Sequence, residues 1–476
     1  MFDVAVIGGG VIGGTILREL TKYGLNVCLL EKESDVSMGQ SRANSGIVHA
    51  GFDAPVGSLK ARFNVAGNLM MEDYAKELGV KFKRNGSLVV AFSEQELKTL
   101  EELKTRGEKN GVTGLEIIDK DALKVKEPNI SKDALGALYA PTGGIVCPYK
   151  LTVASIGNAM DNGAKLFTEF EVNSVKKVDG GFEISCVDGN TVLAKLVINC
   201  AGIYSEYIAN LFGDKTFTVG GRKGEYILLD RECEGYVKHT LFFTPTEKGK
   251  GILVSPTVDG NILLGPTAEQ VSDKNVETSV LGLKEVQEKA VKMCDNVPFF
   301  GTITSFAGTR AYCDRHDFII EESSVIKGLI NCAGVESPGL TSAPAIAKYV
   351  VEELVSKHFE LKENKEFNGQ RIADDFFNHL SVEEKNKIIK ENPAYGRIIC
   401  RCERITEGEI VRAVLTNPPA KNIDAVKRRT RAGMGRCQGG FCQPQVAEII
   451  ARELNIPMES VTKSGKNSYL LRGKTK

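Results

Sequence analysis

The chain opens with two short apolar runs that enclose a segment of helical periodicity. Residues 3–7 (DVAVI) form the first run, apolar positions at helical spacing continue through Leu20, and residues 26–31 (NVCLLE) form the second run. This pattern predicts a strand, a helix that Gly24 closes, and a second strand. A strand, helix and strand in this order are typical of a parallel α/β unit.

The turn between the first strand and the helix carries glycines at the spacing G-x-G-x-x-G, namely Gly8, Gly10 and Gly13. Such glycines allow a tight turn, close approach of a pyrophosphate, and exposure of helix N–H groups to it. Glu31 ends the second strand, where a carboxylate accepts a ribose hydroxyl. The sequence therefore predicts a dinucleotide site. Glu31 disfavours a 2′-phosphate but leaves NAD and FAD open.

Two later segments repeat the scheme of an apolar strand, a glycine turn and a helix. Residues 194–213 place Ala201 and Gly202 after a strand, and residues 325–354 place Gly334 after another strand and before a long helix. Two further glycine-rich turns suit the longer FAD, whose flavin is held far from its adenine, better than NAD.

The middle of the chain changes to alternation typical of antiparallel strands, as in GSLVVAF, GEYILL and GILVSPTVDGNILLGP. The stretch VDGN (258–261) predicts a hairpin turn. We expect this region to form the sheet of a substrate domain.

The C-terminal part begins with a charged stretch, 361–395, which reads as a largely helical connector. After it come two closely spaced cysteine pairs, Cys400-x-Cys402 and Cys437-x4-Cys442, and three predicted helices. The first of these helices carries a capping-box pattern, Thr406 and Glu409. Paired thiolates hold zinc or an iron–sulfur cluster, and a two-iron cluster tolerates the C-x-C spacing that structural zinc sites rarely use.

Composition narrows the class of protein without naming a reaction. The 476 residues allow two to three domains, and 61 basic residues balance 61 acidic ones, so no overall field recruits nucleic acid. The sequence contains no apolar stretch long enough for a transmembrane helix, and its start does not resemble a secretory signal. We expect a cytoplasmic protein, with peripheral attachment at the inner face of the membrane left open. The other eight of the twelve cysteines are scattered among apolar neighbours and are expected to be buried thiols.

The glycine turns, together with residues 39–52 (GQSRANSGIVHAGF) and 57–68 (GSLKARFNVAGN), resemble the D-amino-acid-oxidase-type flavoprotein superfamily over roughly residues 1–360. The segments KGKGILVSPTVDGNILLGPTAEQ (248–270) and RKGEY (222–226) are most similar to its anaerobic, glycerol-3-phosphate-dehydrogenase-like branch. L-2-hydroxyglutarate dehydrogenases share NSGIVHAG and GSLKAR. The resemblance implies FAD, with Glu171 and Val172 beside the adenine. The residues expected to hold FAD are Gly8, Gly10, Gly13, Glu31, Lys32, Ser41, Asn44, Ser45, Gly46, Val172, Ala201, Gly202, Gly334, Gly339, Leu340 and Thr341.

The same resemblance indicates candidates for chemistry. His49 follows the flavin-contacting glycine turn, so it is the expected base for a substrate hydroxyl, the alternative being a structural histidine. Arg310, in a glycine-x-arginine, is expected to face the substrate anion, the alternative being a salt link elsewhere. Arg315, Lys60 and Arg222 are weaker candidates for substrate binding.

The segment around the four cysteines resembles the bacterioferritin-associated-ferredoxin-like [2Fe-2S] domain, although its second pair has the wider spacing of versions fused to flavoprotein dehydrogenases. Zinc and an unmetallated site are the alternatives. A cluster takes one electron at a time, so its presence indicates a dehydrogenase that passes electrons to a partner protein or a quinone. The basic stretch KRRTRAGMGR (427–436) either docks an acidic partner or is a solvated face.

The sequence thus predicts an FAD-dependent dehydrogenase for a small anionic 2-hydroxy substrate, with sn-glycerol 3-phosphate as the first choice. L-2-hydroxyglutarate, an amino acid or opine, and a non-catalytic electron-transfer subunit are the alternatives. The expected fold combines a discontinuous Rossmann-like FAD-binding domain, an antiparallel substrate domain and a small helical cysteine-ligated domain. The predicted divisions are 1–80, 145–215 and 305–360 for FAD, 81–144 and 216–304 for substrate, 361–395 for the connector, 396–460 for the cluster, and 461–476 for a flexible basic tail.

Overall fold

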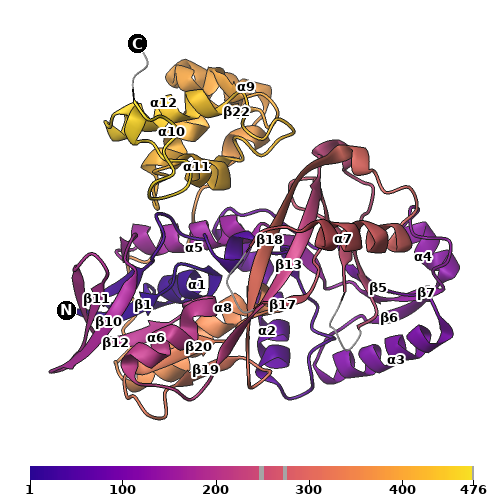
Figure 1. The fold of residues 1–476 in the computed structure, drawn as a ribbon, viewed down its shortest axis with the longest axis horizontal. Coiled ribbons are helices and arrows are strands. Elements are labelled where there is room, and N and C mark those ends of the chain that lie inside the picture. The colour runs from indigo at the N-terminus through magenta and orange to yellow at the C-terminus, as the bar shows by residue number, and fades with distance from the viewer. Residues whose placement is uncertain (246–250, 272–275, 474–476) are drawn as a thin grey trace.

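The computed structural model describes residues 1–245, 251–271 and 276–473. Figure 1 shows a part built around the N-terminal strand and helix at the left, a second sheet with α7 and α3 at the right, and a C-terminal domain above them. Residues 248–250, part of the segment that carries the resemblance, lie outside the described residues. The mixed α/β class and the small C-terminal domain are as predicted.

A mixed sheet of eight strands forms the core of the first part. Its parallel strands follow the order β20, β12, β1, β2, β9, and β10, β11 and β19 extend it by antiparallel pairing. Strands β2 and β20 are buried throughout, as expected for a parallel sheet covered on both faces. The strands are β1 (Phe2–Ile7), β2 (Val27–Leu30), β9 (Lys165–Phe167), β10 (Val172–Val178), β11 (Gly181–Cys186), β12 (Thr191–Asn199), β19 (Ile319–Glu322) and β20 (Leu329–Ala333).

The predicted helix after the first strand is present and packs between two others. Helix α1 contacts both α5 and α8, and α8 also packs against α2. Every residue of α1 is buried, including Arg18, whose guanidinium donates to Asn158 at 2.8 Å and pairs with Glu77 at 2.7 Å. The helix ends at Leu20, before the predicted stop at Gly24. The helices of this part are α1 (Val11–Leu20), α2 (Leu59–Glu77), α5 (Pro148–Asp161), α6 (Ser205–Phe212) and α8 (Gly339–Tyr349).

A second sheet of nine strands forms the right-hand part. All of its pairings are antiparallel except β14 with β5, which confirms the predicted antiparallel sheet. The predicted hairpin joins β15 to β16 with Gly260 at a φ of 89°. Its strands and helices are β5 (Ser87–Ala91), β6 (Glu116–Asp119), β7 (Gly136–Ala140), β13 (Val219–Leu229), β14 (Thr240–Phe243), β15 (Leu253–Pro256), β16 (Ile262–Gly265), β17 (Glu269–Val271), β18 (Thr302–Cys313), α3 (Glu94–Lys109), α4 (Lys120–Lys126) and α7 (Val280–Met293).

The long strand β18 connects the second sheet to the first part. It pairs with β13 along its length, so the predicted division at residue 305 falls inside this strand. Gly308 of β18 meets the loop after β2 so closely that a Cβ there would lie 2.1 Å from the Ala43 carbonyl oxygen. A small sheet of β3 (Ile47–Val48), β8 (Gly144–Val146) and β4 (Phe82–Lys83) lies at the same junction.

The connector is helical only in its second half. Residues 376–379 and 393–396 form 3₁₀ turns and α9 (Val382–Glu391) is an α-helix. Residues 361–375 instead run along the first part, where the Lys362 and Gly369 carbonyls accept from Gly24 N–H and Arg18. The prediction of a largely helical connector is therefore wrong for 361–375, because backbone contacts with the neighbouring domain replace helical bonds.

The C-terminal domain has its own apolar core and the three predicted helices. The capping box of Thr406 and Glu409 is present, and the second helix ends at Arg431 in the left-handed conformation. The segment 461–473 folds back: Thr462 bridges Tyr469, and the Ser464 carbonyl accepts from Ser34 at 2.7 Å. The expected flexible tail is therefore a packed segment up to residue 473. The elements are β21 (Ile398–Cys400), β22 (Ile405–Thr406), α10 (Glu407–Leu415), α11 (Ile423–Thr430) and α12 (Gln443–Leu454).

Buried arginines of the stretch 427–436 hold this domain against the rest of the chain. Arg428 and Arg429 contact the carboxylate of Asp35, in the loop after β2. Arg431 contacts Asp259 of the β15–β16 hairpin at 2.8 Å. These three side chains neither dock an acidic partner nor form a solvated face, because each is buried and paired with a carboxylate of the same chain. Figure 1 shows α11 above α5, with which it is in contact.

Candidate functional site

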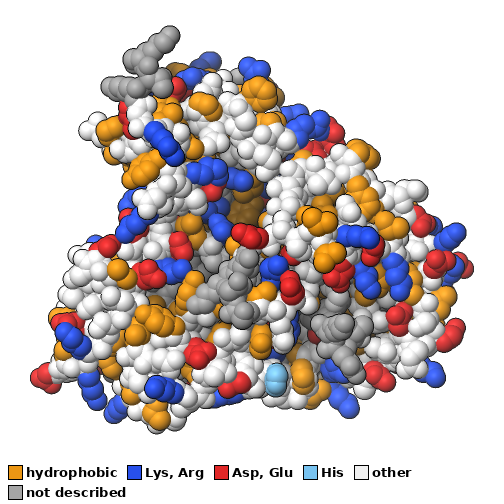
Figure 2. Space-filling model, viewed as in Figure 1, with side chains coloured by type: hydrophobic (Ala, Val, Ile, Leu, Met, Phe, Trp, Pro, Cys, Tyr) orange, Lys and Arg blue, Asp and Glu red, His pale blue; other side chains and the backbone are white. Residues whose placement is uncertain are grey.

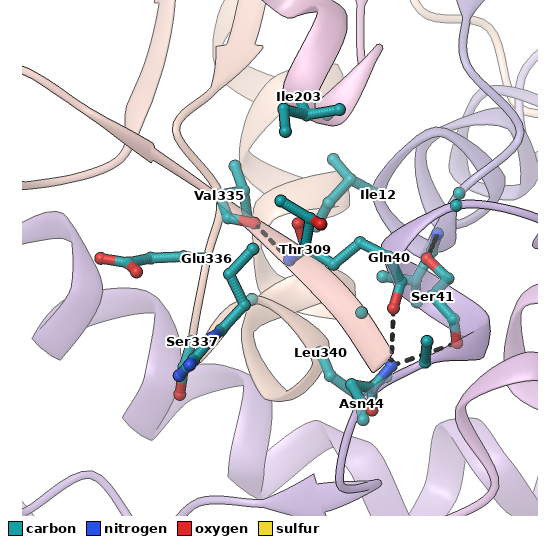
Figure 3. Close-up of a pocket in the computed structure, with 18 of the residues that line it drawn as sticks. Ile12, Gln40, Ser41, Asn44, Ile203, Thr309, Val335, Glu336, Ser337 and Leu340 are labelled. Carbon is teal, nitrogen blue, oxygen red and sulfur yellow. Dashed lines mark hydrogen bonds between the residues drawn. The ribbon is translucent and has the colours of Figure 1, made fainter. Parts of the chain in front are cut away.

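A cavity of about 650 Å³ extends from the first glycine turn to the second sheet. This volume lies within the range of small-molecule and cofactor sites. Its walls come from both sheets and from the loop after β2, so it lies where segments distant in the sequence meet. Figure 3 shows Ser41 and Asn44 on one side of this region and Glu336 and Ser337 on the other.

The first glycine turn leaves no room for side chains. A Cβ at Gly8, whose φ is 112°, would lie 2.4 Å from the Cys200 carbonyl oxygen. A Cβ at Gly13 would lie 2.0 Å from the Gly8 carbonyl oxygen, so this glycine allows the helix to pack against the turn. Gly8 and Gly10 line the cavity, whereas Gly13 supports it from behind. A turn of this shape allows close approach of a pyrophosphate.

Glu31 and Ser41 place polar groups at the same end of the cavity. The Glu31 carboxylate accepts from the backbone N–H groups of Gly9 at 2.7 Å and Glu33 at 2.9 Å, and burial raises its pKa. The Ser41 hydroxyl accepts from the N–H of Val11, in the first turn of α1, at 2.8 Å. These groups suit a ribose hydroxyl and a phosphate near a helix N-terminus.

The turn from Ser41 to Gly46 is stabilised by Asn44. Its side-chain amide donates to the carbonyls of Gln40 and Ser41 at 3.1 Å, and its oxygen accepts from Gly46 N–H at 2.9 Å. Gly46 adopts a φ of 65°, and a Cβ there would lie 2.6 Å from the Val146 carbonyl oxygen. The turn therefore presents backbone to the cavity without side-chain bulk.

His49 lies on the cavity wall just after β3. Its backbone N–H donates to the Thr341 hydroxyl at 2.9 Å, which ties it to α8. Its ring nitrogen Nε2 lies 3.2 Å from the Ser337 hydroxyl, and its ring lies 5.9 Å from that of Phe242. The imidazole is thus held between the two sheets and can exchange a proton with a group in the cavity.

Arg310 reaches the cavity from β18. Its Nη2 donates to the Thr267 carbonyl at 3.0 Å, and its buried Nε has no hydrogen-bond partner among the described residues. Because Nε is inaccessible, the Arg310 guanidinium can meet an anion in the cavity only through its terminal N–H groups. Tyr226, buried on the opposite strand β13, also lines this region.

Glu336 is a charged cavity residue that the sequence analysis missed. Its carboxylate lies 2.9 Å from the Lys60 ammonium and 3.6 Å from Arg222. Lys60 and Arg222, the weaker candidates for substrate binding, line the cavity, but each already has a carboxylate partner. Arg315 pairs with Glu321 at 2.8 Å and is not among the described residues that line the cavity. Arg310 therefore has the strongest geometry for an anion of the four cations.

The structure brings most of the predicted cofactor residues to one cavity. Three of them lie outside its lining: Gly13, Thr341, and Gly334, whose missing side chain makes room for Cys313. The sequence analysis missed the polar side chains of Glu336 and Ser337. Their position in the glycine turn before α8 could have indicated that they lie at the cavity. The predicted residues that do line the cavity are Gly8, Gly10, Glu31, Lys32, Ser41, Asn44, Ser45, Gly46, Val172, Ala201, Gly202, Gly339 and Leu340.

The four C-terminal cysteines come together as two pairs that cross the sequence motifs. The Sγ atoms of Cys402 and Cys437 lie 3.7 Å apart, and Cys400 and Cys442 are hydrogen-bonded to each other. The second pair is buried, whereas Cys402 is exposed. Among the described residues no three histidine, cysteine or acidic side chains converge as they do around one metal ion. Two thiol pairs fit a two-iron cluster, which takes two ligands per iron, better than zinc.

Backbone N–H groups surround the cysteine sulfurs. The hydrogen bond from Cys442 and the N–H groups of Gly433 and Glu403 lower the pKa of Cys400 to about 6. Burial raises the pKa of Cys437, but the N–H groups of Gly439, Phe441 and Gly440 outweigh it and lower the pKa. Such donors stabilise thiolates and tune a bound cluster. The remaining eight cysteines are buried, as predicted.

No helix in the described part of the chain is both long and apolar enough to cross a membrane.

Comparison with known proteins places both sites in families. Residues 3–353 match the family described as FAD dependent oxidoreductase, and residues 398–452 match the BFD-like [2Fe-2S] binding domain. The chain is 50% identical to a "Glycerol 3-phosphate dehydrogenase" of Caloramator mitchellensis over 100% of this chain and 99% of that relative. It is 29% identical to an "L-2-hydroxyglutarate dehydrogenase, mitochondrial" of Pongo abelii, over 76% of this chain and 88% of that relative.

A solved structure is similar to most of the chain. It is "Dithionite reduced L-alpha-Glycerophosphate Oxidase from Mycoplasma pneumoniae with FAD bound", with 30% identity and a TM-score of 0.74. The match covers 78% of this chain and 98% of that one. FAD is bound in that structure, as its name states.

Proposed function

The chain belongs to the family of FAD-dependent oxidoreductases, and we propose that it oxidises sn-glycerol 3-phosphate to dihydroxyacetone phosphate. Its cofactors are FAD and a [2Fe-2S] cluster. Membership in an enzyme family with an intact cavity removes the case for a non-catalytic electron-transfer subunit. The observation that carries the proposal is that His49 and Arg310 line the same cavity as the FAD-binding turns.

Arg310 anchors the phosphate of the substrate. Its terminal N–H groups can donate to phosphate oxygens, while the bond from Nη2 to the Thr267 carbonyl fixes the orientation of the guanidinium. Lys60 and Arg222 are balanced by Glu336, so they add less positive charge to the cavity. The substrate is thereby held by one end, with its C2 hydroxyl free to face the histidine.

His49 accepts the hydroxyl proton of the substrate. Its Nε2 lies within hydrogen-bond distance of Ser337, and the Thr341 hydroxyl holds its backbone, so the ring has a fixed position on the wall. When bound, the flavin supplies the acceptor for the hydride that leaves C2. Cys400, Cys402, Cys437 and Cys442 would hold the [2Fe-2S] cluster, which would supply a one-electron acceptor for the electrons of the substrate. The final acceptor in this proposal is a partner protein or a quinone.

An anaerobic titration followed by visible absorption tests this proposal. Purified protein is mixed separately with sn-glycerol 3-phosphate and with L-2-hydroxyglutarate. Bleaching of the flavin bands by glycerol 3-phosphate alone is the expected result. Bleaching by the hydroxy acid alone contradicts the proposed substrate and keeps the mechanism. If neither compound bleaches the flavin, both candidate substrates are contradicted.

L-2-hydroxyglutarate is the second candidate substrate. The relative from Pongo abelii carries this substrate in its name, and Arg310 can bind a carboxylate as it binds a phosphate. The higher identity over the entire chain, including the cysteine domain, favours glycerol 3-phosphate.

A further inference from the structure

One edge of the C-terminal domain exposes both a cluster cysteine and residues of types that are typical of protein interfaces. We call this the acceptor edge and define it as Arg401, Cys402, Arg404, Cys437 and Phe441. Each of its members is a cysteine of the outer pair or lies within two residues of one of the four cysteines. The inner pair, Cys400 and Cys442, is buried beneath it. The acceptor edge is thus the solvent-facing side of the cluster site.

Phe441 is the apolar element of the acceptor edge. Its side chain is 86% exposed and takes no part in the apolar core of the domain. Its own backbone N–H points at the Cys437 sulfur, so the loop is ordered while the ring faces solvent. An exposed aromatic ring on an ordered loop indicates an interaction site, since aromatic residues and arginine are enriched in interface cores.

Arg401 and Arg404 supply positive charge beside this ring. Both side chains are exposed, and neither forms an ion pair within the described part of the chain. Arg436, next to Cys437, is different because it pairs with Asp230 and Glu232. The acceptor edge therefore carries charge that the chain itself does not neutralise.

The charge of the surrounding domain has the same sign. Residues 396–473 contain 14 lysines and arginines against 7 aspartates and glutamates, although the chain as a whole is neutral. Of these basic residues, Arg428, Arg429, Arg431 and Arg436 pair with carboxylates outside the domain, so Arg401 and Arg404 carry the charge that stays at the acceptor edge. Figure 2 shows Lys and Arg side chains on this domain, at the top of the view.

We propose that the acceptor edge docks an acidic one-electron carrier protein, which receives electrons from the cluster. This inference rests on the proposed function. Each substrate molecule releases two electrons and two protons, so it reduces two carrier molecules in succession. A single phenylalanine on a loop offers less apolar area than membrane binding requires, and the described chain has no membrane-spanning helix. An acidic protein can pair its carboxylates with Arg401 and Arg404 and pack apolar side chains against the Phe441 ring.

The experiment measures reduction of a purified acidic ferredoxin by the holoenzyme and glycerol 3-phosphate under anaerobic conditions. The expected kcat/KM for ferredoxin falls about tenfold between about 20 and about 300 mM ionic strength. Arg401→Glu and Phe441→Ala each lower it about tenfold at low salt. Reduction of the small acceptor ferricyanide and bleaching of the flavin by substrate stay unchanged. The matched controls are Lys98→Glu and Leu281→Ala, exposed residues of α3 and α7.

Each other outcome overturns the proposal. If the kcat/KM for ferredoxin does not depend on ionic strength, or if it falls equally in the control variants, the acceptor edge is not the docking surface. Sedimentation with vesicles of anionic phospholipid, lost in Arg401→Glu, identifies a membrane as the occupant. Dimers that dissociate in Arg401→Glu identify a second copy of the chain. Absence of flavin bleaching by glycerol 3-phosphate is a failure of the proposed function instead, and photoreduced holoenzyme then tests docking without the substrate.

Discussion

The guanidinium of Arg429 forms a two-pronged ion pair with Asp35, with Nη1–Oδ2 and Nη2–Oδ1 distances of 2.9 Å. Both side chains are almost completely buried. Asp35 belongs to the loop that follows Glu31, and Arg429 belongs to the helix α11 of the cluster domain. This pair therefore couples the C-terminal domain directly to the loop that follows Glu31.

Replacing Asp35 by alanine leaves Arg428 and Arg429 buried without their shared counter-charge. We expect the domain interface to lose about 3–5 kcal/mol, because an uncompensated buried charge is costly. Thermal unfolding monitored by circular dichroism measures the change. The control is Asp188→Ala, which removes the exposed pair with Lys466 and is expected to cost less than about 1 kcal/mol. Equal losses of stability in both variants would show that burial of the Asp35 ion pair does not increase its contribution to the free energy of unfolding.

The same pair is expected to persist in acid. Burial raises the pKa of Asp35, but the charges of Arg429 and Arg428 outweigh it and hold the pKa at about 2. An unfolded aspartate has a pKa of about 3.9, so the contribution is complete above that value and is lost as pH falls toward 2. The wild-type and Asp35→Asn stabilities are thus expected to converge only below about pH 4. Convergence near pH 6 would contradict this origin.

Substituting Arg310 by lysine keeps the positive charge but removes the paired N–H donors of the guanidinium. We expect kcat/KM for glycerol 3-phosphate to fall about a hundredfold, because one buried charge-assisted contact is lost. FAD content is expected to stay unchanged. Arg315→Lys, outside the cavity lining, is the control and is expected to retain full activity. Similar losses in both variants would contradict Arg310 as the anion anchor.

Replacing His49 by glutamine removes the base and keeps a polar side chain. Flavin reduction by substrate is expected to slow by about 10²–10⁴, the usual contribution of general base catalysis. Stopped-flow absorbance under anaerobic conditions measures this rate. His379→Gln, at an exposed position, is the control. Loss of FAD together with activity in the His49 variant would indicate a structural histidine instead.

The sequence predicted the elements whose signals are local. The glycines at 8, 10 and 13 and the apolar period behind them located the first turn and helix, because steric demands at a pyrophosphate act within a few residues. The helix that starts at Glu407 was predicted from its capping box for the same reason. The antiparallel sheet was predicted from short strand-like segments and a turn signal, although β5, β15 and β16 are buried throughout.

Contacts between distant segments could not be predicted in this way. Glu336 neutralises Lys60 and Arg222 only because the turn before α8, helix α2 and strand β13 meet in space. The crossed pairing of the cysteines depends on how β21 and α12 pack. The connector was expected to be helical because its charged composition resembles a helix surface, whereas backbone contacts with the first part decide its conformation.

Rapid mixing with glycerol 3-phosphate, followed by freezing and electron paramagnetic resonance, tests the central claim most directly. The claim is that substrate electrons pass through the flavin to the cluster held by Cys400, Cys402, Cys437 and Cys442. A reduced [2Fe-2S] signal that rises after the flavin bleaches is the predicted result. Cys400→Ser is expected to lose this signal and keep the bleaching, whereas Cys233→Ser keeps both. Bleaching of the wild-type flavin with no cluster signal would contradict the account.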